Sequence, residues 1–335
     1  KGSPRLTWLL PPTDLSKKNR RPKPAMSLNA RGGLGTCQHL KPIISTFSLH
    51  ETNPSVSANL EPCSRRKQAP WSCSNMETAP RALVLRAPGT NCDRETAFAL
   101  ETAGAPAETL HLNELRAKPK RLSEFQILVI PGGFSFGDDA GAGAIFGCQL
   151  RHFLGDALKA FRDAGNLILG ICNGFQVLVK TGLLVLPDDE GPLVSLTRNT
   201  SGRYEDRWVH LKARPGNCPF LAAIDRLYLP MAHGEGRFVA RQDWILQGLE
   251  QAGQVVLRYA NHAGEPAAED DRENNPNGSK GAVAGLCDPT GQVLGLMPHP
   301  ERHVLPTHHP RWTREGLAEA PDGLQIFRNA VASFT

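Results

Sequence analysis

The 335-residue sequence lacks several patterns that would assign it to a particular class of protein. No uninterrupted apolar run approaches the roughly 18 residues that a membrane-spanning helix needs, so we expect no membrane partner. None of the eight cysteines forms a CxxC pair, so we expect no zinc site. Cysteines scattered along so long a chain fit a reducing cytosol better than a disulfide framework, and we expect a cytoplasmic protein. The chain begins with Lys1 rather than Met, which leaves its true N-terminus open.

An excess of positive charge is missing from most of the chain. Residues 1–80 hold 12 Lys and Arg against 4 Asp and Glu, whereas residues 81–335 hold 26 against 29. The net charge of +5 therefore belongs to the N-terminal stretch and does not argue for nucleic-acid binding by the whole protein. We expect residues 1–80 to be a disordered basic extension and residues 81–335 to form the folded domain. A basic arm that binds RNA is the less favoured interpretation of residues 1–80.

Apolar runs alternate with helical patterns in the first part of the domain. This alternation predicts parallel βαβ units in an α/β fold, where ligands bind outside the carboxyl ends of the strands. The predicted strands are 82–85, 108–112, 125–130 and 167–171, and the predicted helices are 94–103 and 157–164. Later strands are expected at 208–211, 227–229, 255–259, 282–286 and 292–297, with a loop at 265–280 and a last helix at 323–332. The turn sequence at 288–291 predicts a hairpin between the last two strands.

The stretch 167–180, LILGICNGFQVLVK, predicts a buried strand, a tight turn and a helix. Cys172 lies in that turn between Gly170 and Gly174, as a nucleophile displayed at the top of a sheet requires. Backbone N–H groups at a helix N-terminus stabilise a thiolate. A structural buried cysteine remains an equally good interpretation of this stretch alone. Cys92, which also follows a strand, is a weaker rival because it lacks the flanking glycines.

A cysteine nucleophile needs a base, and the base needs an orienting group. His299 and Glu301 occur in MPHPER after the predicted hairpin, and an extended backbone would turn both side chains the same way. A carboxylate there would hold the imidazole tautomer. A surface loop is the alternative, and His233 in HGEGR is a rival base. The turn at 131–135 could offer N–H groups to an oxyanion or could be a plain turn.

Three histidines near the C-terminus, His303, His308 and His309, could suggest a metal site. Their irregular spacing across prolines, with no helix to align them, favours a solvated loop.

Several longer motifs follow one another along residues 81–335. They are PGTNCD (88–93), PGGFSFGD (131–138), GICNGFQ (170–176), RNTSGRYEDRW (198–208), AHGEGRF (232–238), NPNGSKGAVAG (275–285) and MPHPER (297–302). Together they resemble class I (triad-type) glutamine amidotransferases. More narrowly, they are similar to the PurQ-type glutaminase subunits of phosphoribosylformylglycinamidine synthase, an enzyme of purine biosynthesis. GxCxG with a distant HxE marks the wider class, and CNGFQ, HGEGRF, NPNGS and MPHPER in this order mark the narrower family.

The resemblance implies a flavodoxin-like amidotransferase fold, with a central, mostly parallel sheet flanked by helices and a C-terminal hairpin that carries the His/Glu pair. It implies that Cys172 attacks the side-chain amide of glutamine, that His299 moves the protons, and that Glu301 orients His299. The residues that would hold the oxyanion and the glutamine are Gly133, Phe134, Asn173, Gln176, His233 and Gly234.

The resemblance also implies partners. Ammonia would pass to a PurL-type synthetase subunit, which uses ATP and Mg²⁺ to convert formylglycinamide ribonucleotide to the amidine, and a small PurS-type subunit would help to assemble the complex. No cofactor is then expected in this chain, and its sequence holds no GxxxxGKS phosphate loop. No nucleic-acid partner is expected.

Two departures and two alternatives remain. Residues 1–80 match no part of the family, and the segment 139–143, DAGAG, replaces an aromatic residue and an Arg expected in many relatives. A cysteine hydrolase of the PfpI type would use a similar turn without needing the HxE hairpin. A non-enzymatic RNA-binding or scaffold protein would act through the basic arm.

Overall fold

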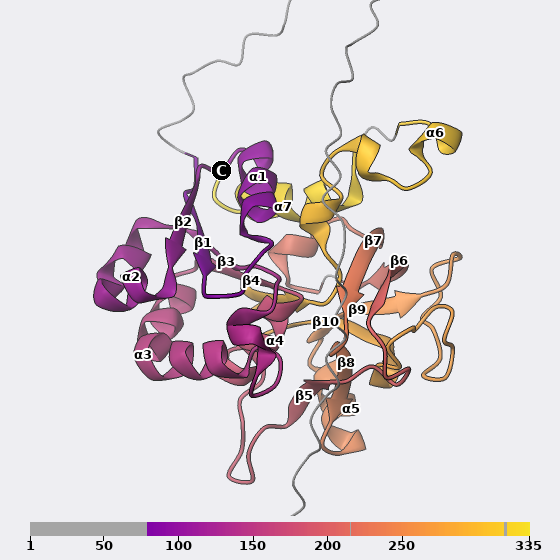
Figure 1. Ribbon diagram of the computed structural model, residues 1–335, viewed down its shortest axis with the longest axis horizontal. Helices are drawn as coiled ribbons and strands as arrows, with labels where there is room; N and C mark the ends of the chain where they lie inside the picture. The colour runs from indigo at the N-terminus through magenta and orange to yellow at the C-terminus, as the bar shows by residue number, and fades with distance from the viewer. Residues whose placement is uncertain (1–78, 215, 318–319) are drawn as a thin grey trace, which may run out of the picture. The chain divides into compact units, whose positions relative to one another are not determined.

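The computed structural model describes residues 79–335 except 215 and 318–319, so the expected disordered extension at 1–80 lies almost entirely outside the described residues. Within the described part of the chain, the elements form a mixed sheet of nine strands and a separate sheet of two (Figure 1). The α/β fold class is confirmed. No helix among these residues is long and apolar enough to cross a membrane.

One half of the large sheet, here called the parallel half, contains strands that all run in the same direction. In spatial order its strands are β2 (Ala107–His111), β1 (Ala82–Arg86), β3 (Ile127–Ile130), β4 (Leu167–Ile171) and β11 (Val293–Leu296). The central strands are uninterrupted apolar runs and are buried along their length. Such runs are typical of parallel strands that helices cover on both faces.

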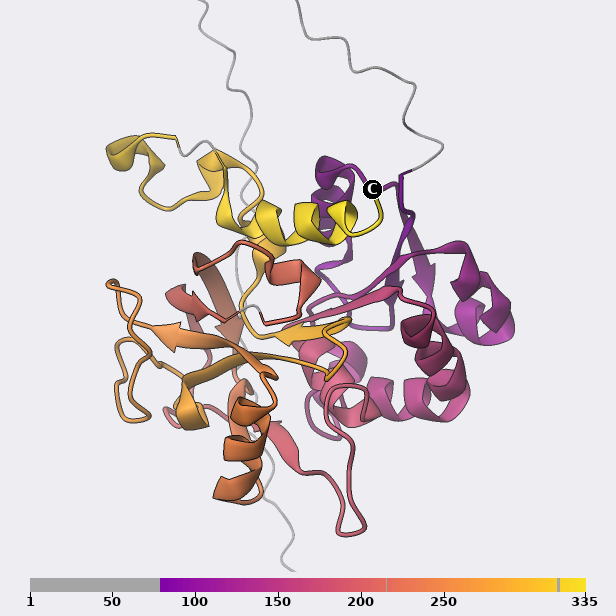
Figure 2. The same ribbon diagram turned by 180° about the vertical axis from the view of Figure 1, so that it is seen from behind.

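The helices of the described residues are α1 (Asp93–Ala103), α2 (Leu112–Ala117), α3 (Ala144–Asp163), α4 (Asn173–Thr181), α5 (Asp243–Gln251), α6 (Trp312–Glu315) and α7 (Asp322–Ala332). Helices α1 and α7 pack together on one side of the parallel half, and α3 packs with α4 on the other (Figures 1 and 2). Gly182 ends α4 in a left-handed conformation (φ 78°), which glycine adopts without steric strain.

The other half of the sheet, here called the antiparallel half, continues from β11. Its strands are β10 (Val283–Cys287), β9 (Val255–Ala260), β6 (Glu205–Ala213) and β7 (Arg226–His233), and β5 (Val194–Thr197) with β8 (Arg237–Ala240) forms the small sheet. The hairpin β10–β11 turns at 288–291, where the Gly291 N–H donates to Asp288 O at 3.0 Å, so the predicted hairpin is confirmed. The loop expected at 265–280 is also confirmed.

Several predicted boundaries were wrong. Helix α3 begins at Ala144, whereas the sequence predicted a helix only from residue 157. Its early turns contain Gly147, a poor helix former, but a Cβ there would lie 2.6 Å from Lys180 Cβ, so close packing on α4 requires the glycine. Strands β6 and β7 are longer than predicted, and α2, α5, α6, β5 and β8 were not predicted.

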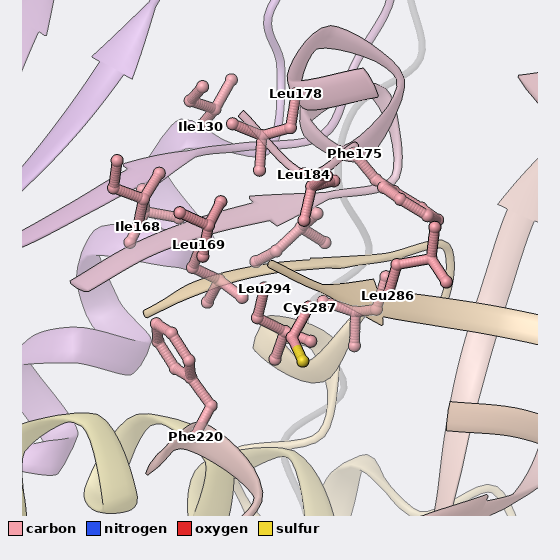
Figure 3. Packing of buried hydrophobic residues seen from close by; sticks show 14 of the residues in the cluster. Ile130, Ile168, Leu169, Phe175, Leu178, Leu184, Phe220, Leu286, Cys287 and Leu294 are labelled. Atoms are coloured by element: carbon pink, nitrogen blue, oxygen red, sulfur yellow. The ribbon is translucent and has the colours of Figure 1, made fainter. Parts of the chain in front are cut away.

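The core under the site lies between α4 and the strands β4 and β11. Figure 3 shows Phe175 and Leu178 of α4 on one side of these strands and Phe220 on the other. All three side chains are fully buried. A Cβ on Gly295 would lie 2.2 Å from the Phe175 ring, so this ring fits against β11 only because residue 295 is a glycine.

Candidate active site

Cys172 occupies a strained turn between β4 and α4. Its φ of 51° and ψ of −105° are unusual for a residue with a side chain. A Cβ on Gly170 would lie 2.6 Å from Gly174 O, and one on Gly174 would lie 1.8 Å from Ile130 O, so both flanking glycines are required. The Cys172 N–H donates to Leu296 O at 2.8 Å, which fixes the turn to the end of β11. The predicted strand–turn–helix arrangement is confirmed.

His299 and Glu301 follow β11, the neighbour of β4. His299 Nδ1 lies 2.6 Å from Glu301 Oε1, and both side chains are buried. The residues 300–302 form a turn of 3₁₀ helix rather than the extended backbone that the sequence predicted, and this turn brings the carboxylate back to the ring. Because an ionised carboxylate only accepts hydrogen bonds, Nδ1 carries a proton, and Nε2 is the ring atom that can take or give the second proton. Nε2 is buried and has no hydrogen-bond partner among the described residues.

The charge of His299 depends on its neighbours. Burial alone would lower its pKa, but the Glu301 carboxylate and the Cys172 sulfur, which contacts the ring, raise the pKa of His299 well above its usual value. The imidazolium is therefore stabilised inside the site. Cys172 and His299 line one cavity, so the structure brings the predicted nucleophile and base together.

Two backbone N–H groups close to Cys172 have no acceptor among the described residues. They belong to Gly133, which lines the cavity, and to Asn173, which directly follows Cys172 but does not line the cavity. Gly133 (φ 140°) pairs with Thr90 in an isolated antiparallel bridge. The residues on either side of Gly133 make the hydrogen bonds of this bridge, through Gly132 O and the Phe134 N–H, so the Gly133 N–H has no acceptor in it. The Phe134 N–H instead donates to Gly89 O at 2.9 Å. Phe134 can therefore contribute its ring to the site but not its N–H.

The cavity has a volume of about 170 Å³. It is lined by Gly133, Phe134, Cys172, Gln176, His233, Gly234 and His299 among the residues that the sequence predicted. It is also lined by Cys92, which the sequence offered as a rival nucleophile, and by Asn91, Asp138, Tyr204, Glu235 and Arg302, which were not predicted as site residues. The exposed rings of Phe134 and Tyr204 stack at its rim, with centroids 6.4 Å apart.

A network of side-chain hydrogen bonds shapes the cavity floor. Asn173 Nδ2 donates to Gln176 Oε1 at 2.9 Å and to Asp138 Oδ1 at 3.2 Å, and Gln176 Nε2 donates to Glu235 O. Burial, followed by smaller effects that include the nearby Glu235 carboxylate, raises the pKa of Asp138. The carboxylates of Asp138 and Glu235 together form an acidic wall of the cavity. The Ala142 N–H donates to Glu235 Oε2 at 3.2 Å, so the divergent segment 139–143 supports this wall.

His233, the rival base, is held as a neutral imidazole. Asn199 Nδ2 donates to the carbonyls of Arg203 and His233, so Asn199 Oδ1 must accept the proton of His233 Nδ1 at 3.2 Å. Nε2 is then an acceptor, buried and without a partner among the described residues. Burial, with a smaller contribution from His299, lowers the pKa of His233 to about 3. His233 can accept a hydrogen bond from a ligand but is a poor base.

One cluster of metal-ligating side chains occurs among the described residues, and it lies within this site. The donor atoms of Cys92, His299 and Glu301 lie within 4.8 Å of one another. The short hydrogen bond between His299 and Glu301 occupies the space where an ion would bind. The Arg302 guanidinium, 3.2 Å from Cys92 Sγ, would repel a cation.

The sequence predicted that the histidines near the C-terminus lie in a solvated loop, which is wrong for His303; His308 and His309 are half-buried in an irregular segment of short turns. His303 is buried, with Nδ1 3.1 Å from Tyr228 O. Its ring and the ring of His309 pack against Trp208 and Tyr228.

Comparisons with known proteins agree with this geometry. The family model of the CobB/CobQ-like glutamine amidotransferase domain matches residues 79–334. The PurQ subunit of phosphoribosylformylglycinamidine synthase from Dehalococcoides mccartyi is 48% identical over 252 residues, which are 75% of this chain and 96% of the relative. The same subunit from Methanococcus maripaludis is 41% identical over 271 residues, with 77% and 99% covered. The solved structure of PurLQS from Thermotoga maritima contains a chain that is 31% identical, with a TM-score of 0.58 and 77% and 100% covered.

The fold and the cysteine site thus define a glutamine amidotransferase of the triad class. Within that class, the chain belongs to the family of the PurQ subunits of phosphoribosylformylglycinamidine synthase. The family predicted from the order of the motifs is confirmed. A cysteine hydrolase of the PfpI type is no longer favoured.

Proposed function

We propose that this chain hydrolyses glutamine to glutamate and ammonia through a thioester on Cys172. The observation that carries the proposal is the buried His299–Glu301 pair at 2.6 Å, whose Nε2 lone pair shares a cavity with the Cys172 thiol. In the first step the thiol proton passes to Nε2 and the sulfur attacks the side-chain amide carbonyl. The N–H groups of Gly133 and Asn173 would hold the resulting oxyanion.

The second half of the cycle returns the enzyme to its starting state. The tetrahedral intermediate collapses, and the amide nitrogen leaves as ammonia after it takes the proton from His299. A water molecule then gives a proton to His299 and attacks the thioester. The carbon–sulfur bond breaks, the thiol recovers its proton, and glutamate is released. Glu301 stays ionised throughout and stabilises the imidazolium in both halves.

The cavity walls suit an amino-acid substrate. The carboxylates of Asp138 and Glu235 form an acidic wall that complements an α-ammonium group, and His233 Nε2 and Gly234 lie beside them. Gln176 is held by Asn173 and Glu235 O and shapes the cavity floor. Phe134 and Tyr204 would cover the bound glutamine at the rim.

The partners follow from the family. We propose that ammonia passes to a PurL-type synthetase subunit, with a small PurS-type subunit in the complex, and that ATP and Mg²⁺ bind to the synthetase. The product would be the amidine of formylglycinamide ribonucleotide.

A reducing cytoplasm is the compartment that suits this chemistry. The thiols of Cys92, Cys148, Cys172, Cys218 and Cys287 are all free, and the mechanism needs a reduced nucleophile.

The test uses the chain reconstituted with its synthetase and small subunit. Glutamine should support amidine formation and release glutamate, and Cys172→Ala should abolish both. The same variant complex should still form the amidine from added ammonium, because the synthetase is intact. Persistent glutaminase activity in Cys172→Ala would reject Cys172 as the nucleophile.

We further propose that the glutaminase activity is latent until the synthetase subunit binds. A fully active isolated chain would contradict this proposal.

A further inference from the structure

A second cysteine lies in the wall of the site, and the mechanism above does not use it. Cys92 is the residue before α1 and is buried. Its N–H donates to Gly132 O at 3.2 Å, so it is fixed to the backbone segment that also presents the Gly133 N–H. Cys92 therefore belongs to the same rigid wall as the proposed oxyanion site.

The Cys92 sulfur links two elements of the site. Its thiol donates to Asn91 Oδ1 at 3.2 Å, and it accepts from Arg302 Nη2 at 3.2 Å. The Nε of Arg302 in turn donates to Glu95 Oε1, on α1, at 2.8 Å. Because Arg302 directly follows Glu301, these contacts fix the turn that carries the orienting carboxylate to the start of α1.

The same sulfur lies against the base. A Cβ built on Gly132 would be 2.9 Å from His299 Cε1, 3.5 Å from Nδ1 and 3.0 Å from Cys92 Sγ. The Gly132 backbone therefore lies against the Cε1–Nδ1 edge of the imidazole, and the Cys92 sulfur lies beside the same glycine. The donor atoms of Cys92, His299 and Glu301 lie within 4.8 Å of one another. The other ring nitrogen, Nε2, has no hydrogen-bond partner among the described residues and is left for Cys172.

The contacts of Cys92 argue against it as the nucleophile, the alternative that the sequence left open. Its thiol hydrogen is directed to Asn91 and its sulfur accepts from Arg302, so its hydrogen bonds are already used within the wall. Burial raises the pKa of the Cys92 thiol, although His299 and Arg302 oppose that rise. A buried thiol that both donates and accepts hydrogen bonds is suited to holding its neighbours in place.

We propose that Cys92 is a positioning residue, which holds the His299 ring between Glu301 and Cys172 and ties Arg302 to α1. The inference rests on the proposed role of His299 as the base. A loosened ring would spend less time in the geometry for proton transfer, and small misplacements of catalytic groups reduce rates strongly. The contact also favours the imidazolium, so its loss should be visible in the pH dependence as well as in the rate.

The experiment compares Cys92→Ala with Cys92→Ser in the reconstituted complex. We expect Cys92→Ala to lower kcat for glutamine hydrolysis by about tenfold to a hundredfold, with KM within about twofold. The alkaline limb of its pH–rate profile should move to lower pH. Cys92→Ser should restore most of kcat, because a hydroxyl keeps the hydrogen bonds to Asn91 and Arg302. Cys287→Ala, which shortens a buried cysteine outside the cavity, is the matched control and should keep the wild-type kcat.

Two further variants keep the test decisive. Glu95→Gln removes the carboxylate that holds Arg302 without touching the thiol, and it should lower kcat and move the alkaline limb in the same direction. If Cys92→Ala does not fold, Glu95→Gln still tests the positioning role. Wild-type kcat and pH profile in Cys92→Ala or Glu95→Gln, beside an inactive His299→Ala, would overturn the positioning role alone. Full activity in His299→Ala would instead overturn the proposed base.

Discussion

The parallel and antiparallel halves of the large sheet contribute different groups of residues to the cavity between them. The parallel half supplies the reacting groups, because Cys172 follows β4 and His299 follows the adjacent β11. The antiparallel half supplies no reacting group but completes the wall, because His233 ends β7 and Tyr204 precedes β6. The two meet where the His299 N–H donates to Pro230 O at 2.8 Å.

The difference follows from strand geometry. Parallel neighbours end at the same edge of the sheet, so groups that follow two of them meet without further adjustment. Antiparallel neighbours alternate in direction, so a hairpin such as β6–β7 brings side chains and loops to the rim instead. We therefore expect changes in the parallel half to alter the rate of chemistry and changes in the antiparallel half to alter substrate binding.

The largest effect is expected for Glu301→Gln. The amide removes the charge that stabilises the imidazolium, and kcat should fall by about a thousandfold with little change in KM. Because the carboxylate raises the pKa of His299, its removal lowers that pKa. The transfer of the thiol proton to Nε2 forms a thiolate–imidazolium pair, and activity is lost when the ring of that pair loses its proton. The alkaline limb should therefore move to lower pH. The pH–rate profile of the complex measures this shift. An unchanged alkaline limb would mean that Glu301 does not control the pKa of His299.

The next largest effect is expected for Gly174→Ala, which tests the turn of the parallel half. The new Cβ would lie 1.8 Å from Ile130 O, a backbone atom that cannot rotate away. Either β3 or α4 must shift, and we expect the free energy of unfolding to fall by about 3 kcal/mol or more. Denaturant unfolding of the isolated chain measures it. A loss below about 1 kcal/mol would mean that the turn is not rigidly packed.

A smaller effect is expected for His233→Gln in the antiparallel half. The substitution removes the rigid imidazole acceptor that Asn199 Oδ1 orients, so KM should rise by about tenfold while kcat changes little. The pKa of His233 is about 3 in the folded chain and near 6.5 when unfolded, so it is neutral throughout the working pH range. Both limbs of the pH–rate profile should therefore stay where they are. A moved limb would return His233 to the role of base.

The same substitution has a consequence for folding. A histidine with a lowered folded pKa contributes stability that is fully present above pH 6.5 and is lost as the pH falls toward 3. The unfolded chain gains the proton first over that interval. The free energy of unfolding of the wild type should therefore decline between pH 6.5 and 3 more steeply than that of His233→Gln. Parallel slopes would contradict the buried, neutral imidazole.

How far the sequence predicts each half follows from the same geometry. The turn at Cys172 was predictable because its signals are local: an apolar run, two glycines and a helical pattern lie within fourteen residues. The pairing of His299 with Glu301 was predictable from their spacing, although the backbone is a 3₁₀ turn and not extended. Cys92 was recognised as a candidate. Its position beside His299 depends on its hydrogen bond to Gly132 and on the packing of α1 against the turn at 300–302, which no local pattern reports.

The walls were harder to predict for a physical reason. Asp138, Tyr204 and Glu235 lie in loops, and their motifs were recognised without a role for these side chains. Their positions depend on tertiary hydrogen bonds such as that from the Ala142 N–H to Glu235. Strand β7 was predicted too short because Pro230 interrupts its apolar residues, and a proline is tolerated there only because β7 is an edge strand. Signals of that kind become readable only when the partner strand is known.

The smallest effect compares two helix glycines, one from each half, that have open space where a Cβ would lie. Gly155 in α3 and Gly248 in α5 each lie within a helix, and a Cβ at either would meet no atom within 4 Å. Alanine at each should raise the free energy of unfolding by about 0.5 to 1 kcal/mol, because it restricts the unfolded chain without strain in the folded one. Thermal and denaturant unfolding measure both. Equal gains in the free energy of unfolding would mean that the two halves differ in their turns and not in their helices. A gain for Gly155→Ala alone would mean that the antiparallel half unfolds separately.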